Sequence, residues 1–380
     1  MRVAGAWVDH PGTQALCLVL EAAGHRALFV GGCVRNALMG VPVADIDIAT
    51  DALPQTVSML AEQAGFRVVP TGIEHGTVTV IVGGLAHEVT TFRRDVETDG
   101  RHAVVAFSTL VEDDAARRDF TMNALYADRT GAVIDPLGGL PDLVARRVRF
   151  VGDAGARIAE DYLRILRFFR FFAHYGDPEG GIDPEGLAAC AAYSGGIEAL
   201  SRERIGAEMR KLLAAPDPAP AVASMAAAGV LSVVLPGADG RALAPLVHLE
   251  GVLAPRWLRR LAVLGGQDVG KRLRLSRREL ADLGHVREEI GGMLSPAALG
   301  FVLGGLLGTD AVLARAAVME QSLPEGWEAE VARGAAATFP LCAADLTDRL
   351  HGPALGAALE AARQRWLASN LTLTRAQLLG

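Results

Sequence analysis

Two carboxylates spaced two residues apart, Asp45 and Asp47, have the clearest chemical potential in this sequence. They alternate with Ile46 and Ile48, which is the pattern of a half-buried strand. The isoleucines would face a core, and the carboxylates would stand side by side on the open face. Because adjacent carboxylates repel each other, a divalent cation that binds both would offset the repulsion. The spacing therefore predicts a site for Mg²⁺, which prefers one or two carboxylates together with phosphate oxygens.

A glycine pair, Gly31 and Gly32, precedes the carboxylates and could bind phosphate. An apolar run at 27–30 predicts a short buried strand before the pair, and 33–39 predicts a helix after it. Glycine lets the backbone approach a phosphate, and the first N–H groups of a helix point at it. A glycine turn or an exposed D-x-D strand alone is commonly structural. Both together, within one strand–helix–strand unit, favour a nucleotide site.

A third carboxylate, Glu88, could join this site. It lies on the second of two predicted strands, 78–82 and 86–92, which Gly83 and Gly84 join as a hairpin. A glutamate on a surface strand would fit the same pattern, so spacing alone leaves both interpretations open.

The composition predicts a soluble globular chain with several cores. Its 380 residues are 51% hydrophobic and 21% charged, and no run of 18 apolar residues indicates a membrane span. The nearest candidate, 296–308, is predicted to be a buried helix. Four scattered cysteines indicate reduced thiols in a cytoplasmic protein. The net charge of -7 argues against a basic nucleic-acid binder as a whole, but a local basic patch would suffice.

The order of elements predicts a mixed α/β part followed by helices. Helices are predicted at 13–23 and 54–64 beside the strands above, and the pattern is helical from 157 onward. The polar, irregular stretch 93–114 predicts a mobile loop that closes over a substrate. A proline-rich stretch at 214–220 predicts a linker.

The segments GGCVRN and DIDIAT resemble the signature of the DNA polymerase β-like nucleotidyltransferases. Within these, the chain is similar to the class II tRNA nucleotidyltransferases (CCA-adding enzymes) and the bacterial poly(A) polymerases. The family has Asp where this chain has Asn36, a change that removes no metal ligand. The segment HEVTTFR also matches the family, which favours the catalytic interpretation of Glu88. The resemblance implies catalysis and metal binding by the carboxylates and a triphosphate cradle from the glycine segment: Asp45, Asp47, Glu88; Gly31, Gly32, Arg35.

The segment RRDFTMNALYAD at 117–128 resembles the family's second motif. The resemblance implies that Arg118 holds the triphosphate and that Asp119 and Asn123 contact the ribose. A helix start would also favour a negative charge at Asp119, and that explanation needs no ligand. The segment 134–149 resembles the third motif, which links the catalytic head to the neck.

Asp161 and Arg164 lie three residues apart in AEDYLRILRFFRFF, which predicts one helix over 159–172 with both side chains on one face. A stabilising ion pair would explain this spacing, but the resemblance implies a base-selecting role. Cytosine and adenine each present an amino donor beside a ring-nitrogen acceptor, which a carboxylate and a guanidinium can match. Uracil and guanine have the opposite order and would be rejected. Arg167, further along the helix, would support the pair or contact phosphate.

Eight basic residues between 256 and 278 form a local cluster in an otherwise acidic chain. A solvated helix face is the ordinary explanation, but such a cluster is also a candidate for gripping an RNA backbone. Its members are Arg256, Arg259, Arg260, Lys271, Arg272, Arg274, Arg277 and Arg278.

The order of elements together with the family resemblance implies four domains: a mixed α/β catalytic head (1–140), a helical neck that selects the nucleobase (141–215), a helical body that binds tRNA (216–310) and a helical tail (311–380). The predicted function is template-independent addition of CCA to the tRNA 3′ end from CTP and ATP, by two-metal transfer with Mg²⁺ and release of pyrophosphate. No membrane or protein partner is implied. The alternatives are a poly(A) polymerase and a non-catalytic RNA-binding protein on the same scaffold; intact Asp45, Asp47 and Arg118 argue against the latter.

Overall fold

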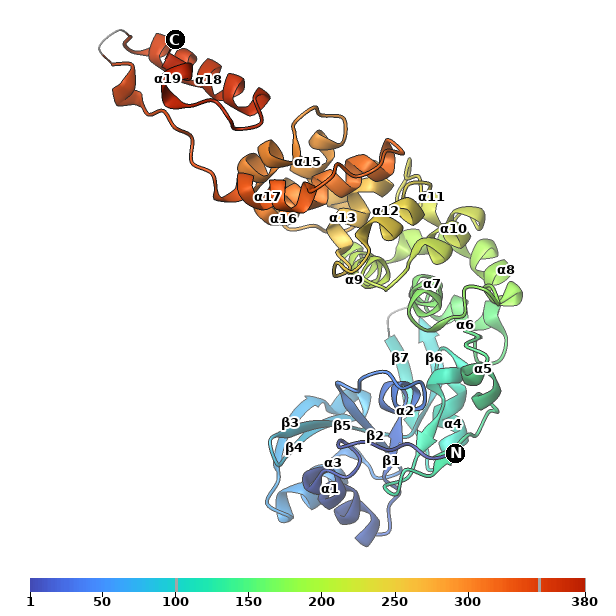
Figure 1. Cartoon of the computed structure of the whole chain (residues 1–380). Coiled ribbons are helices and arrows are strands. Elements are labelled where there is room, and N and C mark those ends of the chain that lie inside the picture. Colours follow the sequence, from blue (N-terminus) through green and yellow to red (C-terminus); the bar gives the residue numbers. More distant parts are fainter. Residues whose placement is uncertain (100–101, 348–349, 380) are drawn as a thin grey trace. The chain divides into compact units, whose positions relative to one another are not determined.

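The computed structural model of the chain describes residues 1–99, 102–347 and 350–379. It contains two compact units, Met1–Leu200 and Ser201–Gly380, and each has its own buried core (Figure 1). The first unit holds the strands and the second is built from helices, which confirms the predicted fold class. The finer division into four domains stays a prediction.

A mixed seven-stranded sheet is the centre of the first unit. Its strand order is β3-β4-β5-β2-β1-β8-β9, and neighbouring strands are antiparallel except for the parallel pair β2 and β5. This one parallel pair brings the segment of the two aspartates beside the strand of Glu88. The strands are β1 (Leu28–Val30), β2 (Ile46–Thr50), β3 (Arg67–Gly72), β4 (Thr77–Val82), β5 (Leu85–Thr91), β8 (Tyr126–Ala127) and β9 (Val133–Ile134).

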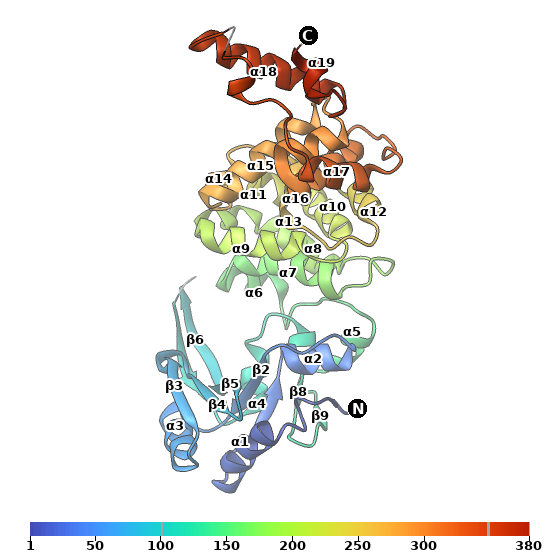
Figure 2. The same ribbon diagram turned by 60° about the vertical axis from the view of Figure 1, so that its left-hand side comes forward.

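Two helices, α1 (Pro11–Ala22) and α3 (Pro54–Gln63), contact each other and β4, so they pack on the same side of the sheet (Figure 2). Each begins with a proline, which has no backbone N–H. Nothing is lost by this, because an N–H at the first position of a helix has no intrahelical acceptor. Both predicted helices are confirmed. Shorter elements connect the strands: α2 (Gly32–Leu38), η1 (Ile73–His75), α4 (Val111–Ala116) and η2 (Thr121–Asn123); α5 (Leu140–Val144) follows the last strand, β9.

The stretch predicted as an irregular loop is largely a two-stranded antiparallel ribbon. Among the described residues, strands β6 (Arg93–Asp99) and β7 (His102–Phe107) pair with each other in a separate two-stranded sheet, and Arg93 is registered against Phe107. The loop prediction is therefore wrong for these strands, and residues 100 and 101 lie outside the described ranges. At the base of the ribbon, a Cβ added to Gly76 would lie 2.9 Å from the Phe107 ring, so a larger residue there would displace that ring.

The helix predicted over 159–172 is two helices, α6 (Ala154–Glu160) and α7 (Leu163–Tyr175), separated by Asp161 and Tyr162. Asp161 has an extended backbone, and its carboxylate accepts a hydrogen bond from the N–H of Leu163 at 3.1 Å. The side chain thereby satisfies a donor at the start of α7. The ring of Tyr162 lies over Gly196, where an added Cβ would be 2.1 Å from a ring carbon.

Aromatic packing joins α7 to the segment of the second motif. The Phe120 ring lies 4.8 Å from Phe171 on α7 and 5.1 Å from Phe150, measured between centroids. This cluster fixes the polar residues around Phe120 against α7. The first unit ends with α8 (Pro184–Ala192) and η3 (Ser194–Ala199).

In the described residues of the second unit, every named element is a helix. Its elements are α9 (Arg202–Leu213), α10 (Ala219–Ala227), α11 (Val230–Val234), α12 (Leu243–Glu250), α13 (Trp257–Leu264), α14 (Val269–Arg272), α15 (Arg277–Ile290), α16 (Pro296–Val318), α17 (Trp327–Ala336), η4 (Ala343–Asp345), α18 (Pro353–Ala368) and α19 (Arg375–Leu379). Helix α13 contacts α9, α12, α15 and α16, so it lies inside this unit.

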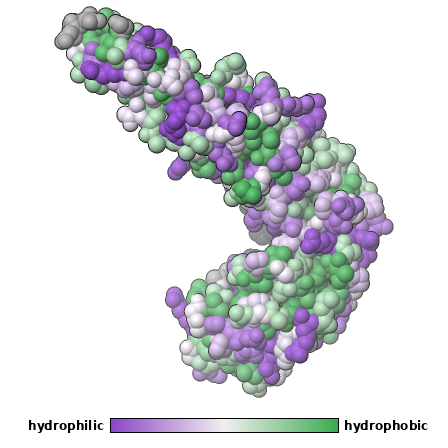
Figure 3. All heavy atoms as spheres, in the orientation of Figure 1, coloured by the Kyte–Doolittle hydropathy of each residue, from purple (hydrophilic) through white to green (hydrophobic). Residues whose placement is uncertain are grey.

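Helix α16 folds back on itself at Gly304, whose φ of 77° and ψ of 170° are not helical. A Cβ on Gly308 would lie 3.1 Å from the carbonyl oxygen of Leu299, so the two halves pack closely. Of the helices in the described ranges, α16 alone has the length and apolar composition to cross a membrane, and 56% of its most apolar window is buried. On the face shown in Figure 3, hydrophobic and hydrophilic residues are intermixed.

Candidate functional site

The register of β2 and β5 places the predicted carboxylates together. Asp47 on β2 is paired directly with Glu88 on β5, so their side chains leave neighbouring strands at the same level and on the same face. Asp45 lies one residue before β2 and is exposed. Ile46 and Ile48 are 6% and 0% exposed, which confirms the predicted alternation between core and open face.

The electrostatics around Asp47 favour a cation. Burial, Glu88 and, to a smaller extent, Asp45 raise the pKa of Asp47 to about 6 against the opposing effect of Arg118. A carboxylate with a raised pKa beside two others gains most from a positive ion. Carboxylate oxygens are the hard ligands that Mg²⁺ prefers, so these residues fit a divalent metal. No group of three or more His, Cys, Asp or Glu in the described ranges could hold a metal alone, so water or substrate would supply further ligands.

Gly31 adopts a backbone conformation that favours glycine, with φ of 71° and ψ of -119°. A Cβ at this position would lie 3.3 Å from Nη1 of Arg118, so the absence of a side chain leaves room beside that guanidinium. The N–H of Gly31 donates to the carbonyl of Leu125 at 3.1 Å and is not free for a phosphate. Helix α2, which begins at Gly32, has only seven residues, and the predicted phosphate contacts of Gly31 and Gly32 stay predictions.

Arg118 is held along one edge by two buried groups. Its Nη2 donates to Oδ2 of Asp114 at 2.7 Å, and its Nε lies 3.1 Å from the hydroxyl of Tyr126. Although burial disfavours its charge, Asp114 and Tyr126 raise the pKa of Arg118. The guanidinium therefore stays charged with its Nη1 beside Gly31.

Arg35 bonds to groups of the chain rather than pointing into open solvent. It is 6% exposed; its Nη1 donates to Oδ1 of Asn123 at 2.5 Å, its Nε to Oδ1 of Asn36 at 3.1 Å, and its Nη2 to the hydroxyl of Tyr175 at 2.8 Å. The guanidinium carbon lies 3.9 Å from the centroid of the Tyr175 ring. Arg35 thus joins α2 to η2 and α7, and its predicted contact with phosphate stays a prediction.

Asp119 and Asn123 belong to the same network. Asp119 accepts hydrogen bonds from Nε of Arg167 at 2.8 Å and from Nδ2 of Asn123 at 2.9 Å, and Asn123 in turn accepts from Arg35. The two residues are 9% and 7% exposed. Both side chains hold elements of the site together, so the predicted ribose contacts would require them to exchange partners. Arg167 joins this network through Asp119, and its predicted support of Asp161 and Arg164, or contact with phosphate, stays a prediction.

Asp161 and Arg164 do not share a helix face, because the chain breaks between α6 and α7. Arg164 forms an ion pair with Glu160, and its Nη1 also donates to the carbonyl of Arg157 at 2.7 Å. The Asp161 carboxylate faces the N–H of Leu163. The predicted one-helix geometry is wrong. The two residues flank the junction, where both are partly exposed.

Sequence reasoning missed the side chains that hold the arginines. Asp114 and Glu160 each lie four residues before the arginine that they bind, a spacing that predicts helical neighbours and could have been recognised. No comparable spacing in the sequence indicated Tyr126 or Tyr175. Tyr175, for example, is 140 residues from Arg35.

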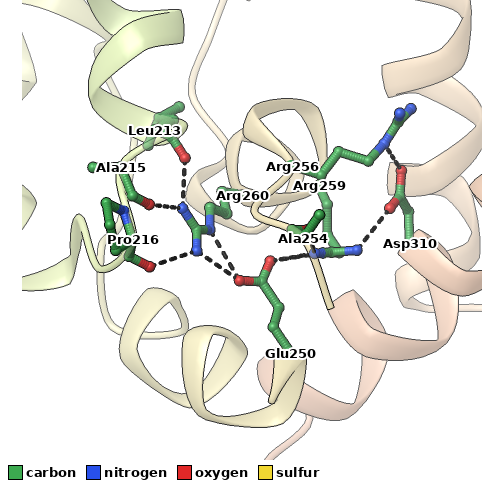
Figure 4. Close-up of polar contacts among 9 residues, drawn as sticks. All are labelled: Leu213, Ala215, Pro216, Glu250, Ala254, Arg256, Arg259, Arg260 and Asp310. Atoms are coloured by element: carbon green, nitrogen blue, oxygen red, sulfur yellow. Dashed lines mark hydrogen bonds and ion pairs between the residues drawn. The ribbon is translucent and has the colours of Figure 1, made fainter. Parts of the chain in front are cut away.

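Part of the predicted RNA-binding cluster is buried in the second unit. Arg259 and Arg260 are 3% and 1% exposed, and both pair with Glu250 (Figure 4). Arg256 and Arg259 also pair with the fully buried Asp310. Arg259 and Arg260 are therefore structural, and their prediction as RNA contacts is wrong, because α13 is packed among other helices and these arginines neutralise buried acids. The Arg256 side chain, just before α13, is 25% exposed, and its predicted RNA contact stays a prediction.

The remaining basic residues lie on α14, α15 and the turn between them. Arg272 is half-buried and donates to the carbonyl of Val233 at 3.1 Å. Four members of the predicted cluster are exposed: Lys271, Arg274, Arg277 and Arg278.

Comparisons with known proteins agree with this geometry. Residues 27–149 match the family described as "Poly A polymerase head domain", and residues 181–240 match "Probable RNA and SrmB- binding site of polymerase A". The crystal structure of a Bacillus stearothermophilus CCA-adding enzyme in complex with CTP is 30% identical, with a TM-score of 0.73 over 94% of this chain and 92% of that one. The chain belongs to the family of CCA-adding enzymes and poly(A) polymerases. This confirms the family resemblance.

Curated members of the family match part of this chain. The human mitochondrial CCA tRNA nucleotidyltransferase 1 is 43% identical over 203 residues, or 53% of this chain and 47% of its own length. The CCA-adding enzyme of Geobacillus thermodenitrificans is 42% identical over 231 residues, or 60% of this chain and 55% of its own length. The chain thus spans about half the length of the curated relatives that it matches.

Proposed function

We propose that this chain adds CCA to the 3′ end of tRNA from CTP and ATP, without a template, and releases pyrophosphate. The observation that carries the proposal is the pairing of Asp47 with Glu88 beside the space between Gly31 and Arg118. Carboxylates for a metal and a guanidinium for phosphate are the two halves of a nucleotidyl-transfer site. The names of the relatives, and the CTP complex of one of them, support the choice of substrates.

In this mechanism the chain positions its substrates and stabilises charge. Asp45 and Asp47 hold the metal, for which we propose Mg²⁺, and Glu88 assists on the neighbouring strand. When bound, a divalent ion supplies a lowered pKa for the attacking 3′-hydroxyl and neutralises charge on the reacting phosphate. Arg118 orients the triphosphate through Nη1, next to Gly31. Arg35 holds α2 in place through its bonds to Asn123 and Tyr175.

Base selection is proposed at the junction of α6 and α7. The Asp161 carboxylate would accept from the exocyclic amino group of C or A, and Arg164 would donate to the adjacent ring nitrogen. The ion pair with Glu160 fixes the Arg164 guanidinium from the side of α6. A mispaired U or G would cover these groups without satisfying their hydrogen bonds, at a cost of about 1–3 kcal/mol each.

Contact with the tRNA backbone is proposed for the exposed cluster Lys271, Arg274, Arg277 and Arg278. Clustered cations can bind phosphates even on an acidic chain, because the attraction is local. A cytoplasmic location, and function without a membrane or protein partner, stay predictions.

One assay separates this proposal from its alternatives. Purified protein is incubated with Mg²⁺, a tRNA that lacks its 3′ end, and each labelled nucleotide in turn. Addition of two C and then one A supports CCA addition. A long ladder of A would identify a poly(A) polymerase, the alternative that the descriptions of both matched families favour. No incorporation would leave a non-catalytic RNA-binding protein.

A further inference from the structure

Arg118 is the arginine aimed at the glycine segment, and its aim is set by groups that a substrate cannot reach. Its Nη1 lies 3.3 Å from the position that a Cβ on Gly31 would occupy. Its Nε and Nη2 are both within hydrogen-bond distance of Oδ2 of Asp114, at 3.2 and 2.7 Å. Asp114 is 1% exposed, and its Oδ1 also accepts a hydrogen bond from Nε of Arg117 at 2.8 Å, so it can act on a ligand only through the arginines that it binds.

Asp114 and Tyr126 together hold one edge of Arg118, and we call this pair the clamp. The Tyr126 hydroxyl donates to Oδ2 of Asp114 at 2.7 Å and accepts from Nε of Arg118 at 3.1 Å, and the tyrosine side chain is fully buried. Tyr126 lies on β8, in register with Val30 on β1, the residue before Gly31. The same strand pair therefore fixes both the glycine segment and the hydroxyl that holds Arg118.

We propose that Asp114 and Tyr126 are positioning residues for triphosphate binding: they occupy one edge of Arg118 and so direct its Nη1 to the space beside Gly31. The inference rests on the proposed function and deepens it. An unclamped arginine would have to be ordered each time a nucleotide binds, and a preorganised one would not. Loss of the clamp should therefore weaken phosphate binding and not only lower the stability of the fold.

A purely structural ion pair is the competing explanation, and the first unit offers a matched control. Asp142 is 5% exposed and accepts hydrogen bonds from Nε of Arg149 at 2.9 Å and from the hydroxyl of Thr121 at 2.7 Å. Like Asp114, Asp142 is a buried aspartate that binds an arginine. Its arginine, Arg149, is not one of the residues placed in the site.

The test measures binding of inorganic tripolyphosphate with Mg²⁺ to the full chain by calorimetry, with thermal unfolding recorded in parallel. Asp114→Asn should weaken binding about tenfold and Tyr126→Phe severalfold, whereas Asp142→Asn should leave it within twofold even if it lowers the melting temperature. In an Arg118→Ala background, Asp114→Asn should cause no further loss, because the carboxylate acts through that arginine.

Two results would overturn the inference: binding within twofold of wild type in folded Asp114→Asn and Tyr126→Phe, or a full further loss in the Arg118→Ala background. If Asp114→Asn does not fold, Tyr126→Phe alone decides, since it removes one oxygen and keeps the ring. Failure of the wild-type chain to bind tripolyphosphate would instead refute the nucleotide site itself, and the role of the clamp with it.

Discussion

Replacing Arg260 with alanine should strongly lower the stability of the second unit against unfolding. The same change at Arg278 should leave that stability unchanged. Both arginines belong to the basic stretch first considered for RNA contact. Arg260 is 1% exposed and bonds to Glu250 through Nε and Nη2, while the Arg278 side chain is 92% exposed. The pair therefore compares one substitution in two environments.

The cost follows from the groups that Arg260 satisfies. Its guanidinium also donates to the carbonyls of Leu213, Ala215 and Pro216, at and just beyond the end of α9 (Figure 4). Removing one partner of a buried ion pair costs roughly 3–5 kcal/mol. Glu250 keeps Arg259, which reduces the loss, but three carbonyls lose their donor. We therefore expect about 4 kcal/mol for Arg260→Ala.

Urea unfolding followed by tryptophan fluorescence measures this effect in the full chain. Three of the four tryptophans report on the second unit: Trp257, Trp327 and Trp366. With a slope of about 2 kcal/mol per molar urea, the transition of that unit should move about 2 M lower in Arg260→Ala. Arg278→Ala should unfold as the wild type does while binding tRNA more weakly. Equal midpoints for the two variants would refute the structural assignment of Arg260.

Further predictions concern the proposed site. Asp47→Ala should abolish nucleotide addition with the circular-dichroism spectrum intact, and appreciable residual incorporation would reject the metal role. Arg164→Ala should admit UTP while Mg²⁺ dependence is kept; continued exclusion of UTP would reject base selection by this residue. Because burial and Glu88 raise the pKa of Asp47 to about 6 in the folded state, above an unfolded value near 3.9, the folded state binds this proton more tightly. The resulting stabilisation is complete below about pH 4 and is lost as the pH rises through 6. In EDTA, Asp47→Asn should therefore melt above the wild type at pH 8 but not at pH 4, and equal differences at both pH values would contradict this pKa.

The metal-site geometry could be predicted from the sequence because a period of two is a local property. Ile46 and Ile48 mark the core side of the strand, which places Asp47 on the other side whatever the strand pairs with. The parallel register with Glu88 could not be predicted this way, because β2 and β5 are joined through two other strands of the same sheet. Only the family resemblance indicated that contact.

The burial of charged side chains in the second unit could not be predicted from the sequence. Arg259 has the composition signal of a surface cluster, yet its partners Glu250 and Asp310 lie 9 and 51 residues away. The break at Asp161 was missed for a related reason. Apolar residues keep a helical spacing on both sides of the break, while the bond from the N–H of Leu163 to the Asp161 carboxylate is invisible to periodicity.

The arginines of the first unit show how such a site can bind a polyanion and still release it. Three of the arginines proposed for base selection, triphosphate binding or support are held by a carboxylate of the chain: Arg118 by Asp114, Arg164 by Glu160 and Arg167 by Asp119. Each pair reduces the net positive charge that the site presents to bulk anions, which lowers non-selective attraction. The same pairs order the guanidinium groups before substrate arrives, so less binding energy is spent on immobilising them. Because geometry rather than total charge then selects the ligand, pyrophosphate without its nucleoside should be held weakly enough to leave between successive additions.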